Sequence, residues 1–358
     1  MIVLATGGTG GHIFAALAVA EEARSRGLAV TVLGERGGME ERLVGAAGVP
    51  FVGVSAGKWH RGRPSPAHAV KAAAGVMEAW RFLRRERPLA VIGFGGFASF
   101  PGVVAASRLG IPLVLHEGNA YPSKVNRWLA RSAALVIAAQ PEAFAHLPAA
   151  RRRLVVPFPV RERRLDREQA RRALALPTEQ PYVVTLVMGG SQGSATLNRE
   201  VPLAHALLAE AEKANLHVVH SAGRGNGATV AAATEGLDRY QVHDFLDAAT
   251  AWAAADLAIT RAGIGTLSEA ALNGVPLIMV PLPSSAEDHQ LHNARAVAAA
   301  GAGLVVEERQ LAAGPRALAD AWQRLLHGEF RAATAAAALA RTPMGAPRRI
   351  LDAVMELK

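Results

Sequence analysis

Three glycine-rich segments of this chain have the composition of turns that bind anionic ligands. Each follows an apolar, strand-like run and precedes a stretch typical of a helix; they are residues 7–12 (GGTGGH), 189–194 (GGSQGS) and 260–269 (TRAGIGTLSE). Glycine lets the backbone approach a ligand closely, and the first turn of a helix offers N–H groups that have no partner within the helix. The three segments therefore predict phosphate-binding turns.

Two titratable groups near such turns are candidates for acid–base chemistry. His12 is the only titratable residue of the first turn, and an imidazole with an ordinary pKa near 6.5 can accept a proton at neutral pH. Glu117 belongs to a polar cluster, His116 to Asn119, that directly follows the apolar run 111–115. We expect His12 to be the catalytic base, with Glu117 as the competing candidate.

Side chains in the second half of the chain suit a phosphate, a ribose and a sugar. Arg261 could pair with a phosphate through two N–H groups. Glu269 lies in the first or second turn of an expected helix, where its carboxylate could bind ribose hydroxyls or compensate the helix dipole. Residues 287–290 (EDHQ) carry carboxylate and amide groups suited to sugar hydroxyls, or else begin a solvated helix.

Metal and thiol chemistry have no counterpart in the sequence. The chain contains no Cys, which excludes disulfides, thiolate zinc sites, iron–sulfur clusters and cysteine nucleophiles. It contains no HExxH motif and no Asp-x-Asp pair, so we expect neither a metal nor a cofactor. Residues 93–98 (GFGGFA) do match the dinucleotide pattern G-x-G-x-x-A, with Glu117 about 20 residues further on. An NAD-dependent dehydrogenase or a nucleotide-binding module therefore stays open as an alternative.

The 358 residues of the chain predict two domains, at about 100–200 residues per domain. The order strand, glycine turn, helix begins at residues 1–27 and again at 182–210, as in doubly wound parallel sheets. The expected fold is α/β, with two Rossmann-like domains that have parallel sheets and face a central cleft: residues 1–162 and 163–342. A C-terminal helix at about 343–358 could pack back on the first domain, which periodicity alone does not decide. Ligands bind such sheets at the carboxyl ends of the strands, where every candidate above falls.

Positive charge is concentrated in the first half of the chain. Residues 1–165 contain 22 Lys+Arg and 10 Asp+Glu, whereas residues 166–358 contain 17 and 20. Such a field attracts an anionic partner. Trp59 and Trp80 lie among basic residues, which is the composition of a contact with an anionic membrane surface. The position of Trp80 is explained equally well by an ordinary amphipathic surface helix over residues 66–87.

Two other segments argue against a nucleic acid partner and against a membrane-spanning helix. The Arg-rich stretch 151–172 is interrupted by the apolar run 155–160, so it predicts a linker and a strand, and we expect no nucleic acid partner. The uncharged stretch 88–107 contains two Pro and four Gly, which favours strand, loop and helix over a membrane span. The first residues are typical of a strand and not of a secretory signal. We expect a soluble or peripheral protein.

The ordered set of motifs resembles the MurG family of glycosyltransferases over nearly the whole chain. The residues that carry the resemblance are 7–12, 93–101, 116–119, 189–193, 261–269 and 288–293. The resemblance implies a GT-B fold and an inverting, metal-independent transfer of GlcNAc from UDP-GlcNAc. The acceptor would be the C4 hydroxyl of the muramyl residue of lipid I. Lipid II would form at the cytoplasmic face of the inner membrane, where such an enzyme is peripheral.

Matching positions with the family carries over a set of donor-binding residues. With Gln192 and Arg261 added from the turns described above, the candidate donor site comprises Thr9, Gly10, Gly11, Asn119, Arg161, Ser191, Gln192, Leu246, Arg261, Ile264, Gly265, Thr266, Leu267, Ser268, Glu269 and Gln290. In the family pattern, Ser191 would meet the diphosphate, Leu246 the uracil through its backbone, and Gln290 the GlcNAc hydroxyls.

The sequence departs from the family at several positions. Gly118 stands where Gln is usual, and Ala15 stands where Pro is usual. A related GT-B enzyme that uses UDP-GlcNAc on another acceptor, or a hexosamine 2-epimerase, therefore stays open as well.

Overall fold

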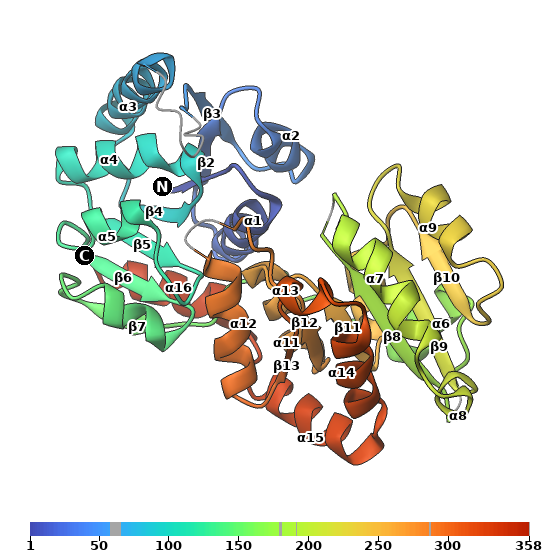
Figure 1. The fold of residues 1–358 in the computed structure, drawn as a ribbon. Helices are drawn as coiled ribbons and strands as arrows, with labels where there is room; N and C mark the ends of the chain where they lie inside the picture. Colours follow the sequence, from blue (N-terminus) through green and yellow to red (C-terminus); the bar gives the residue numbers. More distant parts are fainter. Residues whose placement is uncertain (58–65, 179–180, 191, 286–287, 358) are drawn as a thin grey trace. The chain divides into compact units, whose positions relative to one another are not determined.

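Apolar segments that end in glycine turns form the strands of two separate parallel sheets, as Figure 1 shows for the computed structural model. The structure describes residues 1–57, 66–178, 181–190, 192–285 and 288–357. The chain divides into two units, of which the first comprises Met1–Glu162 with Pro343–Lys358 and the second comprises Arg163–Thr342. Trp59 lies outside the described residues, and so does Ser191.

The first unit contains a seven-stranded parallel sheet in the order β3-β2-β1-β4-β5-β6-β7. Its strands are β1 (Ile2–Thr6), β2 (Val30–Glu35), β3 (Phe51–Val54), β4 (Ala90–Gly95), β5 (Leu113–Glu117), β6 (Leu135–Ala138) and β7 (Arg153–Val155). Its helices are α1 (Gly10–Ser25), α2 (Met39–Ala46), α3 (Pro66–Glu86), α4 (Phe100–Leu109), α5 (Lys124–Leu129) and α16 (Ala346–Met355), with 3-10 turns at Phe97–Ser99 and Pro141–His146.

The second unit contains a six-stranded parallel sheet in the order β10-β9-β8-β11-β12-β13. Its strands are β8 (Val183–Met188), β9 (Leu216–Ser221), β10 (Tyr240–His243), β11 (Leu257–Thr260), β12 (Leu277–Met279) and β13 (Gly303–Val305). Its helices are α6 (Arg167–Ala173), α7 (Ala195–Ala206), α8 (Glu210–Lys213), α9 (Gly227–Ala233), α10 (Ala248–Ala254), α11 (Ile264–Asn273), α12 (His289–Ala299), α13 (Glu308–Leu311), α14 (Arg316–Leu326) and α15 (Gly328–Leu339).

Both sheets reverse their strand order at the same place, beside their first strand. β1 lies between β2 and β4, and Thr6 at its end is paired with Gly95. β8 lies between β9 and β11, and Met188 at its end is paired with Thr260. The glycine turns after β1, β4, β8 and β11 are therefore at the switch points where doubly wound sheets bind ligands. The predicted α/β fold with a duplicated Rossmann-like scheme is confirmed.

The C-terminal helix α16 packs on α1 of the first unit. Arg26 of α1 donates from Nη1 to Asp352 Oδ1 at 2.6 Å, and Arg349 donates to the carbonyl of Val155 at 3.0 Å. Ile350 and Val354 are fully buried, so the contact has an apolar centre with ion pairs around it.

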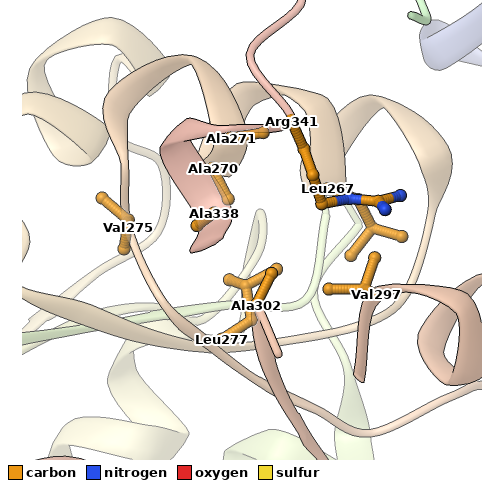
Figure 2. Close-up of a pocket in the computed structure, with 9 residues that line it drawn as sticks. All are labelled: Leu267, Ala270, Ala271, Val275, Leu277, Val297, Ala302, Ala338 and Arg341. Atoms are coloured by element: carbon orange, nitrogen blue, oxygen red, sulfur yellow. The ribbon is translucent and has the colours of Figure 1, made fainter. Parts of the chain in front are cut away.

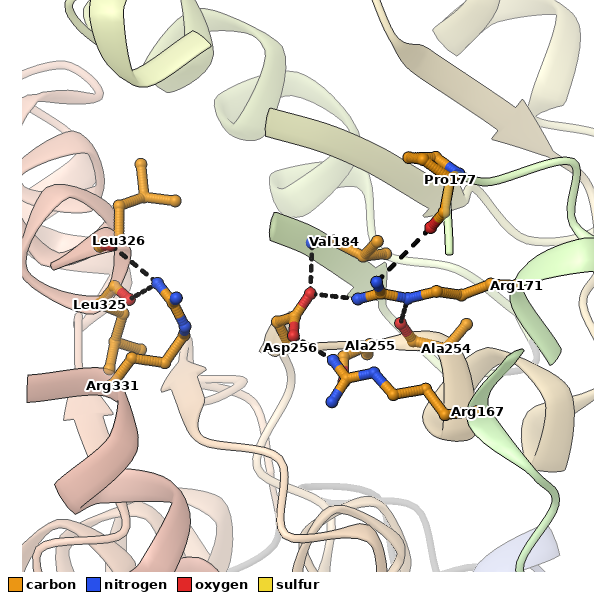
Figure 3. A network of polar contacts seen from close by, with 10 residues as sticks. All are labelled: Arg167, Arg171, Pro177, Val184, Ala254, Ala255, Asp256, Leu325, Leu326 and Arg331. Carbon is orange, nitrogen blue, oxygen red and sulfur yellow. Dashed lines mark hydrogen bonds and ion pairs between the residues drawn. The ribbon is translucent and has the colours of Figure 1, made fainter. Parts of the chain in front are cut away.

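A buried ion pair fixes the amino-terminal edge of the second sheet, opposite the glycine turns (Figure 3). Asp256, just before β11, pairs with Arg167 and Arg171 of α6 and accepts from the backbone N–H of Val184 at 2.7 Å. Arg171 is only 2% exposed. Removing one partner of such a pair leaves the other charge buried and uncompensated, so Asp256 ties α6, β8 and β11 together. Figure 3 also shows Arg331 of α15, which donates to the carbonyls of Leu325 and Leu326 at the end of α14.

Helix α3 packs its smallest residues against the first unit and leaves large apolar ones outside. Its buried residues are Ala72, Gly75, Ala79 and Leu83. Val70 is 68% exposed and Met77 is 49% exposed. In the described part of the chain, no helix is both long enough and apolar enough to cross a membrane.

Candidate functional site

The turn between β1 and α1 is shaped by two glycines that no other residue could replace without strain. Gly7 has φ +147° and Gly8 has φ +81°. A Cβ on Gly7 would lie 2.0 Å from Glu40 Oε1, and one on Gly8 would lie 2.7 Å from the Phe97 ring. Thr9 then takes the N-cap position, so that α1 begins at Gly10 and its first N–H groups have no partner within the helix.

A buried carboxylate beneath this turn was not foreseen from the sequence. Glu40, on α2, is 1% exposed. Its Oε1 accepts from the N–H of Glu35 at 3.0 Å, and its Oε2 accepts from the N–H of Gly8 at 3.4 Å. Glu40 therefore holds the glycine turn from below, where it links the ends of β1 and β2. Its neighbour Glu41 is exposed, and the sequence offered no signal to tell the two apart.

His12 lies at the surface of the same turn. Its Nδ1 is 2.8 Å from the hydroxyl oxygen of Thr9, and its side chain is half-exposed. The ring lies beside the turn after β4, since a Cβ on Gly95 would be 3.4 Å from His12 Nε2. A Cβ on Gly96 would be 1.8 Å from the carbonyl oxygen of Gly7. The segment that matched a dinucleotide pattern is thus glycine-rich because it must fit closely against the first turn and His12.

Glu117, the competing candidate for the base, is fully engaged as a structural acceptor. Oε1 accepts from the backbone and the side chain of Asn119 at 2.9 and 3.2 Å. Oε2 accepts from the N–H of Ser123 at 3.0 Å and from Asn126 Nδ2 at 2.8 Å. These bonds fill the four acceptor positions of a carboxylate. Burial raises the pKa of Glu117, although the hydrogen bonds act in the opposite direction. The geometry therefore supports Glu117 as the residue that orients Asn119, and it does not support the expected role as a base.

His116 lies in the core beneath this edge and not at its surface. It is 1% exposed, and its ring lies 5.2 Å from that of Phe94 and 5.5 Å from that of Phe158. Burial, with a smaller effect from the charge of His12, lowers the pKa of His116 to about 3. His116 is therefore neutral at physiological pH.

Arg161 lies on the same unit as His12 and is exposed. Its guanidinium carbon is 6.0 Å from the ring centroid of Phe14, on the exposed side of α1. Arg161 thus lies near α1 through Phe14, whereas Glu117 holds Asn119 in the segment after β5.

In the second unit, the turn after β8 is held closely against β9. Gly193 has φ +74°, and a Cβ there would lie 2.0 Å from the carbonyl oxygen of Ala222. Ser194 caps α7 by accepting from the N–H of Leu197 at 3.2 Å. Gln192 is exposed on this turn.

The turn between β11 and α11 is clamped on both sides of one residue, Ala262. The N–H of Ala262 donates to Gln290 Oε1 at 3.2 Å, and the carbonyl of Ala262 accepts from Asn293 Nδ2 at 3.3 Å. Gln290 Oε1 also accepts from the N–H of Leu282 at 3.0 Å. Because both of these donors are N–H groups, the oxygen of Gln290 is fixed in place and its NH2 group remains available as a donor.

Helix α11 begins without a side-chain cap. Its N-cap residue is Gly263, and the first helical bond runs from the N–H of Leu267 to the carbonyl of Gly263 at 3.1 Å. The N–H groups of Ile264, Gly265 and Thr266 therefore have no partner within the helix, and the positive end of the helix dipole adds to their attraction for an anion. The start of α11 is therefore a candidate for binding an anion.

Glu269 lies in the second turn of α11, and Leu246 precedes α10. Glu269 Oε2 accepts from Trp252 Nε1 at 2.9 Å, and burial raises the pKa of its carboxyl despite that bond. Leu246 is 8% exposed, whereas its neighbour Phe245 is 60% exposed. Ser268 is buried, so its hydroxyl is less accessible than that of Thr266.

A small apolar pocket lies behind α11 (Figure 2). Its lining is apolar except for one arginine: Leu267, Ala270, Ala271, Val275, Leu277, Val297, Ala302, Ala338 and Arg341. The side chain of Leu267 therefore faces this pocket, and only its backbone is on the side of the helix start. Among the described residues, no three His, Asp or Glu side chains are grouped so that they could hold a metal ion.

Comparison with known proteins gives matches for both units. Residues 2–138 match the glycosyltransferase family 28 N-terminal domain, and residues 184–346 match the C-terminal domain of the same family. The chain is 46% identical to the UDP-N-acetylglucosamine–N-acetylmuramyl-(pentapeptide) pyrophosphoryl-undecaprenol N-acetylglucosamine transferase of Deinococcus deserti, with 99% of this chain and 98% of the relative covered. It is 43% identical to the Deinococcus radiodurans protein of that name, with 99% and 95% covered.

Solved structures agree with this assignment. The crystal structure of Acinetobacter baumannii MurG matches with a TM-score of 0.80 and 30% identity over 99% of both chains. The calicheamicin glycosyltransferase CalG4 matches with a TM-score of 0.69 at 20% identity, over 99% of this chain and 97% of that one, which supports the fold alone. The family resemblance and the GT-B fold inferred from the sequence are thereby confirmed.

The support that Glu40 gives to the first turn can be tested without a ligand. We expect Glu40→Ala to speed amide hydrogen exchange at Gly8 and Glu35, because both N–H groups lose their acceptor. It should also lower the free energy of unfolding by about 1–3 kcal/mol. Exchange measured by NMR and a denaturant titration would check both. Glu41→Ala is the matched control, because Glu41 is exposed and accepts from Gly37 instead; an equal effect from that variant would contradict the assignment.

Proposed function

This chain belongs to the MurG family of UDP-GlcNAc-dependent transferases, and from that premise we propose that it moves GlcNAc from UDP-GlcNAc onto lipid I. The acceptor atom is the C4 hydroxyl of the muramyl residue, and the product is lipid II, a precursor of peptidoglycan. The observation that carries the proposal is the uncapped start of α11, clamped by Gln290 and Asn293. It is a rigid anion-binding site in the unit that matches the family's C-terminal domain.

The second unit supplies the donor-binding residues in this proposal. The N–H groups of Ile264, Gly265 and Thr266 bind the diphosphate, together with Ser191, Gln192 and Arg261. Glu269 accepts from the ribose hydroxyls, since its Oε2 is fixed by Trp252 and its other oxygen remains for a ligand. The backbone of Leu246 meets the uracil, and the NH2 group of Gln290 donates to the GlcNAc hydroxyls. Leu267 and Ser268 contribute through the backbone, because their side chains are buried.

The first unit supplies the groups around the reacting centre. Thr9, Gly10, Gly11, Asn119 and Arg161 lie at the donor sugar in this proposal. The support for it is local, because Glu117 fixes Asn119 and the first N–H groups of α1 have no partner within the helix.

We assign the catalytic base to His12. It is half-exposed and bonded to Thr9, whereas the acceptor positions of Glu117 are filled. His12 takes the proton of the C4 hydroxyl as that oxygen attacks the anomeric carbon of GlcNAc. The bond from that carbon to the diphosphate breaks, UDP leaves with the electron pair, and the anomeric configuration inverts. The dipole and N–H groups of α11 stabilise the charge that develops on the leaving diphosphate.

We further propose that α3 contacts the cytoplasmic face of the inner membrane, which makes the enzyme peripheral. Val70 and Met77 keep their apolar side chains exposed beside the exposed Lys71 and Arg81. Apolar side chains flanked by cations suit an anionic lipid surface. Trp80, the residue first expected there, is a poorer probe because it packs partly against the core and lies under Arg84.

The donor can be tested by thermal-shift titrations with UDP, UDP-GlcNAc, UDP-glucose and NADH. A ligand that binds only the native state stabilises it by roughly 2.7 kcal/mol at about 100 times its dissociation constant. We expect UDP and UDP-GlcNAc to raise the melting temperature and NADH to have no effect. A response to NADH without one to UDP would support the dehydrogenase alternative. Conversion of UDP-GlcNAc to its 2-epimer without acceptor would support the epimerase.

The variant His12→Ala distinguishes a catalytic base from a residue that binds the donor. We expect kcat to fall by about 100-fold or more, because general-base catalysis contributes roughly 10²–10⁴-fold. The dissociation constant of UDP should change by less than about threefold. Steady-state kinetics with lipid I and calorimetric titration with UDP measure the two effects. Equal losses in both would make His12 a donor ligand instead.

The membrane contact predicts that Val70→Glu with Met77→Glu weakens binding to phosphatidylglycerol vesicles by about tenfold or more, since each buried apolar side chain contributes roughly 1.5–3 kcal/mol. Binding by the unchanged protein should also fall as salt is added. Leu203→Glu is the control, because Leu203 is also 49% exposed but belongs to the second unit. Vesicle co-sedimentation that does not distinguish the variants would rule out α3 as the contact.

A further inference from the structure

In the second unit, one carboxylate oxygen contacts two residues that are far apart in the sequence and follow different strands of the sheet. Glu308 Oε1 accepts from the hydroxyl of Thr196 at 2.8 Å. The same oxygen lies 2.6 Å from Arg261 Nη1. Thr196 is in the first turn of α7, Arg261 directly follows β11, and Glu308 is the first residue of α13. Glu308 thus belongs to neither of the glycine turns that it connects.

Arg261 is anchored through only one of its nitrogen atoms. Nη1 donates to the carbonyl of Val280 at 3.0 Å, in addition to its ion pair with Glu308. The side chain is 11% exposed. Among the described residues, Nε and Nη2 of Arg261 have no hydrogen-bond partner. The guanidinium is therefore fixed on one side and keeps its other donors for a ligand.

The position of Glu308 calls for an explanation, because a carboxylate beside an anion-binding edge repels the anion. Two features offset that repulsion. Its charge is paired with Arg261, and its Oε1 already accepts from Thr196 and contacts Nη1 of Arg261. An arginine that is already fixed loses less rotamer freedom when it binds a phosphate than a free one does.

We propose that Glu308 is a positioning residue for the diphosphate. It fixes Arg261 and the start of α7 so that the donors of both turns converge on one ligand. The inference rests on the proposed function, since it concerns the UDP that the second unit binds there. It adds a residue outside the glycine turns to the groups that determine donor affinity.

The inference predicts different effects on UDP and on uridine, which lacks the phosphates. In Glu308→Ala we expect the dissociation constant of UDP and the KM of UDP-GlcNAc to rise about tenfold. The affinity for uridine should stay within about twofold. In Glu308→Gln the side-chain oxygen can still accept from Thr196 and Arg261, so UDP affinity should return to within about threefold of the unchanged protein. Thr196→Val removes one of the two contacts and should fall between these values.

The dissociation constant of UDP is measured by calorimetric titration of each folded variant, and that of uridine by competition with UDP. Circular dichroism tests whether each variant folds. Glu307→Ala is the matched control, because Glu307 precedes Glu308 but pairs with the exposed Arg295 and Arg309. The inference is overturned if Glu308→Ala binds UDP as the unchanged protein does, if UDP and uridine weaken equally, or if Glu308→Gln is no better than Glu308→Ala. If Glu308→Ala does not fold, the UDP affinity of Thr196→Val is the test instead. Absence of UDP binding by the unchanged protein would instead contradict the proposed function.

Discussion

Turns at the end of a parallel sheet can bind a ligand only if something holds their backbone in place, and in this protein carboxylate and carboxamide side chains from neighbouring helices or from the end of a strand do so. Glu40 holds the turn after β1, and Glu117 holds the segment after β5. Gln290 and Asn293 hold Ala262 from both sides. Each of these side chains accepts or donates a hydrogen bond where the turn backbone has no partner in a neighbouring strand. The remaining N–H groups of the turn can therefore face a ligand.

The positions of the turns could be predicted from the sequence because fully buried parallel strands give apolar runs, and a tight strand-to-helix connection needs glycine. The turns at 7–12 and 189–194 are predicted on that basis, and the fold follows from the repetition of strand, glycine turn and helix at 1–27 and 182–210. The side chains that hold the turns in place could not be predicted in the same way. Glu40 and Glu41 are adjacent acidic residues on one short helix, and only the packing of α2 decides which of them is buried.

The chemistry of the segment after β5 depends on packing that composition does not show. The sequence predicts a polar cluster there, with Glu117 as the competing candidate for the base. The structure places His116 in an aromatic core and fills the four acceptor positions of Glu117. Whether a carboxylate is a base or a scaffold depends on how many N–H groups reach it, and Ser123 and Asn126 reach Glu117 from the following turn and α5. That information lies in the path of the chain after the motif, not in the motif.

The two units differ in the kind of group that their turns expose, and the proposed transfer uses both kinds. The first presents an imidazole at the surface, and the neutral His116 beneath it adds no second cation at neutral pH. The second presents helix N–H groups and an arginine that is paired with Glu308. A base must accept a proton during the reaction, so it benefits from a position that a substrate can reach. The groups that stabilise a leaving diphosphate act best when they need no rearrangement, so they benefit from being held rigidly beforehand. The hydrogen bonds and the ion pair that fix Ala262 and Arg261 fit this requirement.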